Sequence, residues 1–520
     1  MRQILFIYFG LFLCYGSVFS QNYNTNPDSA LQIILSKIDG AKLTLAQAQQ
    51  IAMENSAEIK ENKARLDAAE AVVQRERGIF DPELFARLEY IKQNQPSASF
   101  FAGADVLSTR QTNGLAGIRM NLPIGTYLEA SLNSTRLKTN SSFAALNPQY
   151  DLFGQLTLRQ PLLNGFMASS RKQLSSAEKA LDAARETYQQ AVIDFTAQIE
   201  SSYWDLYAAE RDYAVQYLVR DRAQAILDET KIRAKTGLVG PGQVANAEVF
   251  LAEQELLLID RQEQLDQLSD KFAASIGQRP AENKTRFIMT SKPSSSFETG
   301  NVDALVAQAV EKNRQLQAIQ NEKESLNLLA NAADWEALPS IDLLGSLGSS
   351  GLSGSAQDVL FGGQVFRSSV DGDFSDALSQ VTKRDYPSWS VGIEISYPIG
   401  SRSGRGERNR LQAQVVQSEQ RYISAKRTLE EQIRSTCREL QNGSRRLDIA
   451  RNAVGAAQEQ VRIGLIEYRN GRSTAFELVR LGADFAAAQQ RYSQELVRNA
   501  KAAAKLKQLT SGTFEPEKTN

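Results

Sequence analysis

A stretch of about 70 residues without glycine or proline constrains this chain more than any other feature. It lies between Gly165 and Thr236, and nothing within it obliges a helix to stop. At a rise of about 1.5 Å per residue, one helix over this stretch is about 100 Å long. An average globular helix has only about 11–12 residues. The segment Thr236–Val244, rich in glycine and proline, predicts a tip, after which a shorter helix returns to Gly277.

Both arms of this hairpin carry apolar residues at helical spacing. The stripe of the first arm is Val192, Phe195, Ile199, Tyr203 and Leu206. The stripe of the return arm is Leu258, Leu265, Leu268, Phe272 and Ile276. Such stripes are typical of helices that pack on other helices, so they predict packing and no catalysis.

Composition excludes several classes of function. Lys plus Arg is 59 and Asp plus Glu is 60, so no basic excess indicates nucleic-acid binding. The chain has no histidine, which removes the commonest general base and metal ligand. Cys14 and Cys437 are the only cysteines, so a disulfide framework and a Cys-rich metal site are excluded. We therefore expect no enzyme, no metal site and no cofactor.

Two loose motif matches do not change this expectation. The segment Gly400–Gly406 lacks the Lys-Ser/Thr ending of a phosphate loop and does not lie in a βαβ unit. The segment Asp371–Asp376 has Asp376 where a calcium loop requires glycine. Both segments are better explained as flexible or solvated connections.

Residues 1–20 predict a cleaved signal peptide. Arg2 supplies the positive charge, Ile4–Leu13 is apolar, and Val18–Ser20 precedes the expected cleavage before Gln21. After it, no run approaches the roughly 20 apolar residues of a membrane helix. An exported chain of this kind is either soluble or crosses a membrane as a β-barrel.

The remaining chain predicts a helix, strands and a long hairpin, in that order. Thr44 is a plausible N-cap of the helix, and alternation of apolar and polar residues indicates the strands. Within the strand region, residues 93–112 and 140–150 are expected to be polar loops. The expected segments are a lead-in at 21–42, a helix at 43–81, strands at 82–161, the hairpin at 165–277 and a polar linker at 278–300.

The same order then returns. Pro82 pairs with Pro339 at an offset of 257, and Gly237 pairs with Gly471 at an offset of 234, so the chain is a duplicated unit. The first strand region is longer, which allows a second strand hairpin around 114–135. The expected segments of the second unit are a helix at 301–337, strands at 338–398 with a long loop at 345–386, a hairpin at 403–510 and a tail at 511–520.

Several motifs together resemble the TolC-like outer-membrane efflux protein family over nearly all of the mature chain. They are Leu43–Asn55 in the opening helix, Gln160–Gly165 and Tyr397–Gly400 at the strand-to-helix junctions, Gly237–Val239 and Tyr468–Gly471 at the tips, and Leu506–Gly512 at the close. The resemblance implies an α+β membrane protein with duplicated long helical hairpins. Its strands would join a shared trimeric transmembrane β-barrel, with four strands from each chain and about twelve in all.

The resemblance implies the outer-membrane exit duct of a tripartite efflux or type I secretion system. Such a homotrimer extends through the periplasm and conducts substrates passively. Its partners would be a periplasmic adaptor, an inner-membrane pump of RND, ABC or MFS type and outer-membrane lipid. The alternative is a soluble periplasmic coiled-coil scaffold or adaptor. An envelope enzyme is a third reading, which the absence of histidine disfavours.

The family also implies roles for the tips. Glu477 keeps a carboxylate where relatives narrow the pore, Gln243 is its neutral counterpart, and Arg480 stands where relatives often have another acid. Tyr468 matches a tyrosine that latches the closed tip. These four residues are the expected periplasmic gate. The expected adaptor-docking residues are Gly237, Leu238, Val239, Gly471, Arg472 and Ser473.

Overall fold

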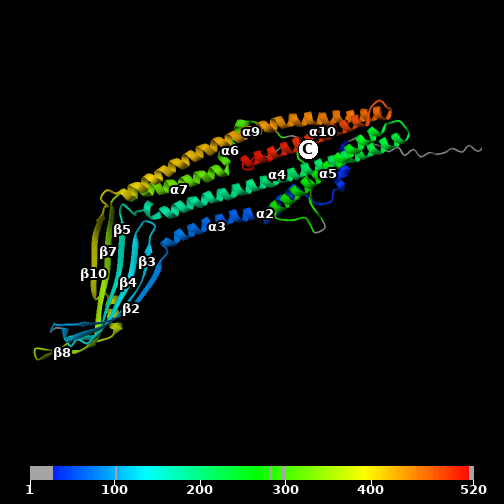
Figure 1. Ribbon diagram of the computed structural model, residues 1–520. Helices are drawn as coiled ribbons and strands as arrows, with labels where there is room; N and C mark the ends of the chain where they lie inside the picture. Colours follow the sequence, from blue (N-terminus) through cyan, green and yellow to red (C-terminus); the bar gives the residue numbers. More distant parts are fainter. Residues whose placement is uncertain (1–26, 100–101, 282–283, 295–296, 298, 515–520) are drawn as a thin grey trace, which may run out of the picture.

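The chain has long helices at one end and a large sheet at the other (Figure 1). The computed structural model describes residues 27–514 except 100–101, 282–283, 295–296 and 298. The expected signal peptide at 1–20 lies outside the described residues. No described helix contains a run long and apolar enough to cross a membrane.

The two long hairpins have matching dimensions. The helices are α4 (Ala168–Lys235) and α5 (Pro241–Ile276) in the first hairpin, and α9 (Arg402–Arg469) and α10 (Ala475–Leu509) in the second. Both α4 and α9 have 68 residues, which corresponds to about 100 Å. Met167 and Ser401, which precede them, both have a positive φ and are 234 residues apart. The second hairpin therefore repeats the first at the offset of the tip glycines.

The shorter helix expected in each unit is interrupted. It divides into α2 (Leu45–Asn55) and α3 (Ala57–Arg77) in the first unit, and into α6 (Val302–Lys312) and α7 (Arg314–Glu336) in the second. Ser56 and Asn313 occupy the breaks with extended backbone, and their side chains accept the N–H groups of Ile59 and Leu316. Short polar side chains that cap a new helix in this way compete with helix continuation. The predicted N-cap at Thr44 is present as a capping box with Gln47.

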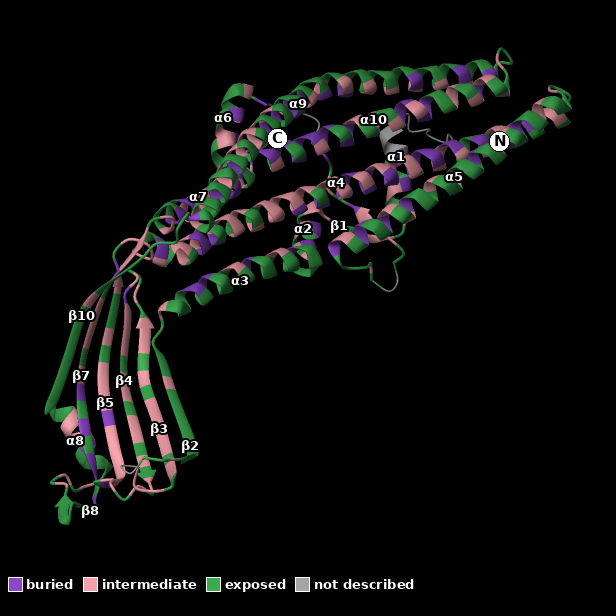
Figure 2. Cartoon of the chain, turned by 60° about the vertical axis from the view of Figure 1, so that its left-hand side comes forward, coloured by how far each residue is buried: buried purple, intermediate pink, exposed green. Residues whose placement is uncertain are grey.

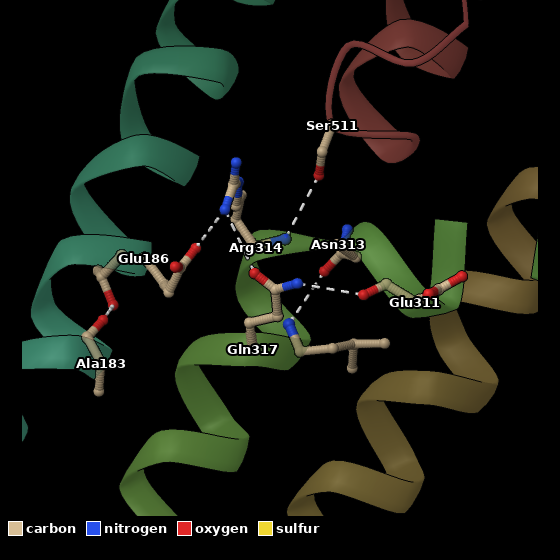
Figure 3. A network of polar contacts seen from close by, with 9 residues as sticks. Ala183, Glu186, Glu311, Asn313, Arg314, Gln317 and Ser511 are labelled. Atoms are coloured by element: carbon tan, nitrogen blue, oxygen red, sulfur yellow. Dashed lines mark hydrogen bonds and ion pairs between the residues drawn. The ribbon is translucent and has the colours of Figure 1, made fainter. Parts of the chain in front are cut away.

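The break at Asn313 joins three parts of the chain (Figure 3). The backbone N–H of Arg314 donates to Oγ of Ser511 at 3.3 Å, and its guanidinium donates to Oε2 of Glu186 at 3.0 Å. Nδ2 of Asn313 donates to the carbonyl of Leu509 at 3.2 Å. The break thus fixes the end of α10 and the first third of α4 against the start of α7.

The polar linker expected at 278–300 contains a strand, so that expectation was incomplete. Strand β1 (Ala41–Leu43), which follows α1 (Pro27–Lys37), pairs in parallel with β6 (Phe287–Met289). Phe287 and Met289 are buried in the largest core cluster. A strand of three residues is too short to give a periodic sequence signal.

The sheet has six antiparallel strands in the order β10-β7-β5-β4-β3-β2. Its strands are β2 (Glu83–Pro96), β3 (Val106–Asn121), β4 (Tyr127–Thr139), β5 (Leu146–Pro161), β7 (Ser340–Ala356) and β10 (Tyr386–Ser396). The hairpin suspected around 114–135 is present as β3 and β4. The expectation of four sheet strands per chain is therefore wrong, because this sheet has six strands within the described residues.

Much of the sequence expected to form loops is strand. In the first unit, β2 extends to Pro96 and β3 begins at Val106, while β4 extends to Thr139 and β5 begins at Leu146, so these connections are shorter than the expected loops. The segment expected as a long loop at 345–386 contains most of β7, the hairpin of β8 (Asp358–Phe361) and β9 (Gln364–Arg367), and helix α8 (Phe374–Lys383). Glycine and serine permit strands here because the ladder bonds come from the backbone. At Gly351 a Cβ would lie 2.1 Å from the carbonyl oxygen of Ala377, so glycine allows α8 to pack on β7.

The two faces of the sheet differ in polarity. Direct cross-strand neighbours lie on one face, and one such row runs across all six strands as Leu84, Ile118, Ala130, Leu156, Leu347 and Trp389. At the edges Leu84 is 82% exposed and Trp389 is 76% exposed. The opposite face carries ion pairs, with Arg119 2.7 Å from Glu83 and Arg159 2.7 Å from Asp342. Below, "apolar face" means the face of Leu84 and Trp389.

The buried residues concentrate between the helices, whereas the sheet is largely exposed or half-buried (Figure 2). The predicted stripe of α4 is buried at Phe195, Ile199, Tyr203 and Leu206. From α5, Phe272 packs edge-on against Tyr203 with ring centroids 6.2 Å apart. The stripes thus form a helix-on-helix core, as expected.

Candidate functional site

The two tips have the same backbone geometry. In the first tip Leu238 N–H donates to the carbonyl of Arg233 at 3.0 Å. In the second, Arg472 N–H donates to the carbonyl of Glu467 at 2.8 Å. Gly237 has φ +77° and Gly471 has φ +73°. These bonds around a left-handed residue form a Schellman motif, which favours glycine at that position.

The adaptor-docking residues expected from sequence lie in these turns. A Cβ placed on Gly237 or Gly471 would find no atom within 4 Å, so the backbone of each turn is open. Leu238 and Arg472 are exposed, while Val239 and Ser473 are half-buried. The tips of the two hairpins lie at the same end of the molecule, far from the sheet (Figure 1).

Tyr468 connects the two hairpins within one chain. Its side chain is only 2% exposed. Its hydroxyl lies 3.2 Å from Oγ1 of Thr230 in α4, and Arg233 donates to its backbone carbonyl at 3.0 Å. The Arg233 guanidinium also lies over the Tyr468 ring, 4.2 Å from its centroid, and Glu229 holds that guanidinium at 3.0 Å. Tyr468 therefore fastens the second tip to the first.

The sequence did not indicate Thr230 and Arg233. Thr230 is fully buried, and its hydroxyl also donates to the carbonyl of Ile226 at 2.7 Å. Both residues lie on the other hairpin from Tyr468, more than 230 residues away. A single sequence carries no signal for a contact of that separation, because it depends on how the hairpins pack.

The acid expected at the gate is paired with a base. Oε1 of Glu477 lies 2.5 Å from Nη2 of Arg480, one turn along α10, and Glu477 raises the pKa of the Arg480 guanidinium. The N–H of Glu477 is itself capped by Thr474 at 3.3 Å. Glu477 and Arg480 are three residues apart on a helix, and that spacing in the sequence favours an ion pair between them. The structure therefore joins Glu477 and Arg480 into one group with no net charge.

Gln243 occupies the matching position in the first hairpin. It lies in the first turn of α5 and is half-buried. Its distance from Glu477 along the chain is the offset of 234 that relates the tips. The four expected gate residues therefore all lie near the tips, with Tyr468 in the contact between hairpins and the others at the starts of α5 and α10.

One buried and one half-buried acid in α4, Glu210 and Asp212, were also missed. Glu210 is 3% exposed, and its Oε1 accepts the backbone N–H of Met289 in β6 at 2.8 Å. Burial raises the pKa of Glu210 to about 8 and that of Asp212 to about 6. The β1–β6 pair lies alongside α4 and buries Glu210. That strand pair was not expected from the sequence.

The described residues include no group of histidine, cysteine, aspartate and glutamate able to hold a metal ion. Cys437, the cysteine within the described part, is buried, and burial raises the pKa of its thiol. A buried thiol with a raised pKa is a poor nucleophile.

The model of one protein family, the outer membrane efflux proteins, matches residues 48–278 and 305–512. The chain belongs to this family. The protein is thus a bacterial outer-membrane efflux protein, and its family is one of channels rather than of enzymes. No curated protein sequence matches it.

Solved channels share the fold of this efflux protein. The outer membrane protein VceC of Vibrio cholerae is 15% identical, covers 91% of this chain and 97% of its own, and has a TM-score of 0.63. The CmeC outer membrane channel of Campylobacter jejuni is 14% identical, with 91% and 86% covered and a TM-score of 0.63. The open state of the MtrE outer membrane channel of Neisseria gonorrhoeae is 16% identical, with 90% and 89% covered and a TM-score of 0.58. The TolC-like fold expected from the sequence is confirmed.

Proposed function

We propose that three copies of this chain form the exit duct of a tripartite efflux or type I secretion system, through which substrates pass passively. One observation carries the proposal. A sheet with two unpaired edges and an apolar face is attached to two helical hairpins. The longer helix of each hairpin spans about 100 Å. A sheet of this kind suits the wall of a membrane barrel, and rods of this length suit a passage across the periplasm.

The edges of the sheet support assembly from copies of the same chain. Strands β2 and β10 form the edges, and unpaired edges invite pairing with another chain. With six antiparallel strands the two edge strands run in opposite directions. The β10 of one copy can therefore pair antiparallel with the β2 of the next. Three copies then give eighteen strands rather than the twelve expected from the sequence.

The polarity of the sheet supports a water-filled duct. The apolar face carries exposed Val391, Ile393 and Ile395 on the edge strand β10, which suits contact with lipid. The other face carries the Glu83–Arg119 pair and is suited to an aqueous lumen. A soluble scaffold, the alternative function, gives no reason for an exposed apolar face of this extent.

The tips support a role in docking and gating. The open backbone at Gly237 and Gly471 allows close approach of an adaptor, which links the duct to an inner-membrane pump of RND, ABC or MFS type. Gln243, Tyr468, Glu477 and Arg480 are the proposed gate residues. Tyr468 holds the two hairpins of one chain together in the closed tip.

The test measures both the export of compounds by cells and the assembly state of the protein. A strain lacking the protein should accumulate exported compounds across a panel, and the full-length chain should restore export. The protein should run as heat-resistant trimers from an outer-membrane fraction. A monomer recovered in the soluble periplasmic fraction would reject the proposal and favour the scaffold.

A further inference from the structure

A group of four basic side chains lies at the end of the sheet far from the helices. Lys92 in β2 is directly opposite Arg110 in β3, and Arg110 is directly opposite Lys138 in β4. Arg136, two residues before Lys138, is opposite Thr112 in the neighbouring row. Direct cross-strand partners and every second residue share a face. All four basic side chains, here called the basic cluster, are therefore on one face, and all are exposed.

The basic cluster lies on the apolar face. Along β2, Leu84, Leu88 and Tyr90 point to this face before Lys92 does, since they differ from it by even numbers of residues. The cluster thus begins where the apolar band ends. Tyr90 is exposed at the border, where barrels that cross a membrane carry an aromatic girdle. This border corresponds to the outer leaflet, because the helices lie at the opposite end.

The chain does not neutralise the basic cluster. On the other face of the sheet, Arg119 pairs with Glu83 and Arg159 pairs with Asp342. Within the described part of the chain, by contrast, no member of the basic cluster has an acidic partner. Like charges directly opposite each other destabilise an antiparallel pair. An anion bound between the three strands would remove this repulsion.

We propose that Lys92, Arg110, Arg136 and Lys138 bind the phosphate-bearing headgroups of outer-leaflet glycolipids. The inference rests on the proposed function, which places this face of the sheet against lipid. A ligand on this surface touches the apolar band and the basic cluster together, so it needs both acyl chains and negative charge. A phosphorylated glycolipid has both, whereas a soluble anion has only the charge.

The experiment measures thermal unfolding of the purified full-length protein in detergent with three probes. These are bis-phosphorylated lipid A, its dephosphorylated form and inorganic phosphate. Lipid A is expected to raise the melting temperature, and the other two probes are not. The triple variant Lys92→Gln, Arg110→Gln and Lys138→Gln should weaken the apparent affinity for lipid A about a hundredfold, because each basic residue near a membrane surface contributes about a factor of five.

A matched control keeps this test interpretable. Arg87 is an exposed base on the same strand but on the other face, so Arg87→Gln should leave the lipid A response unchanged. Without lipid the triple variant should melt at the same or a higher temperature than the wild type, since it loses only repulsion. An unchanged lipid A response in the triple variant, or an equal response to inorganic phosphate, would overturn the proposal. If the protein restores export but lipid A does not raise its melting temperature, this inference alone is rejected. If lipid A raises the melting temperature but the protein does not restore export, the proposed function alone is rejected.

Discussion

At the scale of single residues, Tyr468 makes the most specific contact of the tips. Its ring lies under the Arg233 guanidinium and its hydroxyl reaches Thr230, so its side chain contacts the first hairpin in two ways. A buried cation–π contact contributes about 2 kcal/mol and a neutral hydrogen bond about 1 kcal/mol. The ring therefore matters more than the hydroxyl for holding the hairpins together.

We predict that Tyr468→Ala raises the single-channel conductance in planar bilayers, because the second tip loses the side-chain contacts that attach it to the first and keeps only the bond from Arg233 to the backbone carbonyl. Tyr468→Phe should have a much smaller effect, since it keeps the ring. Tyr422 offers a control, because Lys323 lies 5.7 Å from its ring centroid at a distance from the tips. Equal effects of Tyr422→Ala and Tyr468→Ala would argue against a latch.

Pairing with Arg480 changes what Glu477 is expected to do. Three copies of a neutral pair give a ring without net charge, so we expect weak ion selectivity in the wild type. Arg480→Gln should free the carboxylate and shift the reversal potential in a salt gradient toward cation selectivity. Glu477→Gln should shift it toward anion selectivity.

The Glu459–Arg462 pair of α9 is a control for this experiment, with the same spacing and the same distance of 2.5 Å. Glu459→Gln should leave the reversal potential unchanged. If Glu477→Gln also leaves it unchanged, Glu477 does not line the conducting path.

Glu210 predicts a dependence of stability on pH. Burial raises its pKa in the folded protein from the usual 4.5 to about 8. Its contribution to stability is therefore complete below about pH 4.5 and is lost as the pH rises through about 8.

Glu210→Gln keeps an acceptor for Met289 N–H and has no charge. This variant should melt at a higher temperature than the wild type above about pH 8, with a smaller difference near pH 5. The exposed Glu253→Gln should show no such difference, and parallel melting curves for Glu210→Gln and the wild type across this range would contradict the prediction.

At the scale of elements, the hairpin ends follow a common rule. The ends of α4, α5, α9 and α10 all have a left-handed residue just beyond them, at Gly237, Gly277, Gly471 and Ser511. The two hairpins agree residue for residue at an offset of 234, with Gly277 matching Ser511. Each of these helices thus ends next to a residue with left-handed backbone.

We predict that Gly471→Leu and Gly237→Leu abolish export while trimers remain intact, because the added side chain keeps an adaptor from the turn. The strain of a positive φ costs about 1–2 kcal/mol and does not unfold a protein of this size. Gly512 has φ +82° and equally open surroundings away from the tips, so Gly512→Leu controls for strain. Normal export by both tip variants would count against docking at these turns.

At the scale of the whole molecule, the hairpin β3–β4 sets the size of the proposed barrel. Its turn is attached to the start of α4, where Met167 N–H donates to the carbonyl of Ile124 at 3.3 Å and Ser170 Oγ donates to that of Pro123 at 2.9 Å. With strands about 4.8 Å apart and tilted by about 40°, eighteen strands give a diameter of about 36 Å, against about 24 Å for twelve. Because β3 and β4 are paired within the sheet, the proposed trimer includes this hairpin in its wall.

Electron cryomicroscopy of the purified trimer should resolve eighteen strands in the barrel. Deletion of residues 98–141 removes β3 and β4 but leaves β2 and β5 antiparallel, so this variant should form a barrel of twelve strands. A wild-type barrel of twelve strands, with β3 and β4 outside the wall, would refute the assignment.

The sequence alone determined the features that rest on local rules. A long segment without glycine or proline indicated the first long helix, the tip glycines indicated the turns, and paired residues at offsets of 257 and 234 indicated the duplication. The sequence also placed the proposed gate and docking residues at the tips, because Gln243 and Glu477 each follow a tip glycine by six residues and the family resemblance indicated the others. The breaks at Ser56 and Asn313 escaped prediction, although their capping side chains were visible in the sequence.

Only the tertiary structure decided the features that depend on distant neighbours. Strand β7 is rich in glycine and serine, and pairing with β5 and β10 makes it a strand. Three further features bring together residues from separate elements. They are the contact of Tyr468 with Thr230, the burial of Glu210 beside β6, and the placement of Lys92, Arg110 and Lys138 opposite one another. The physical reason is common to all of them. Helix ends and turns are fixed by hydrogen bonds within a few residues, whereas sheet register, burial and charge environment are fixed by packing between elements.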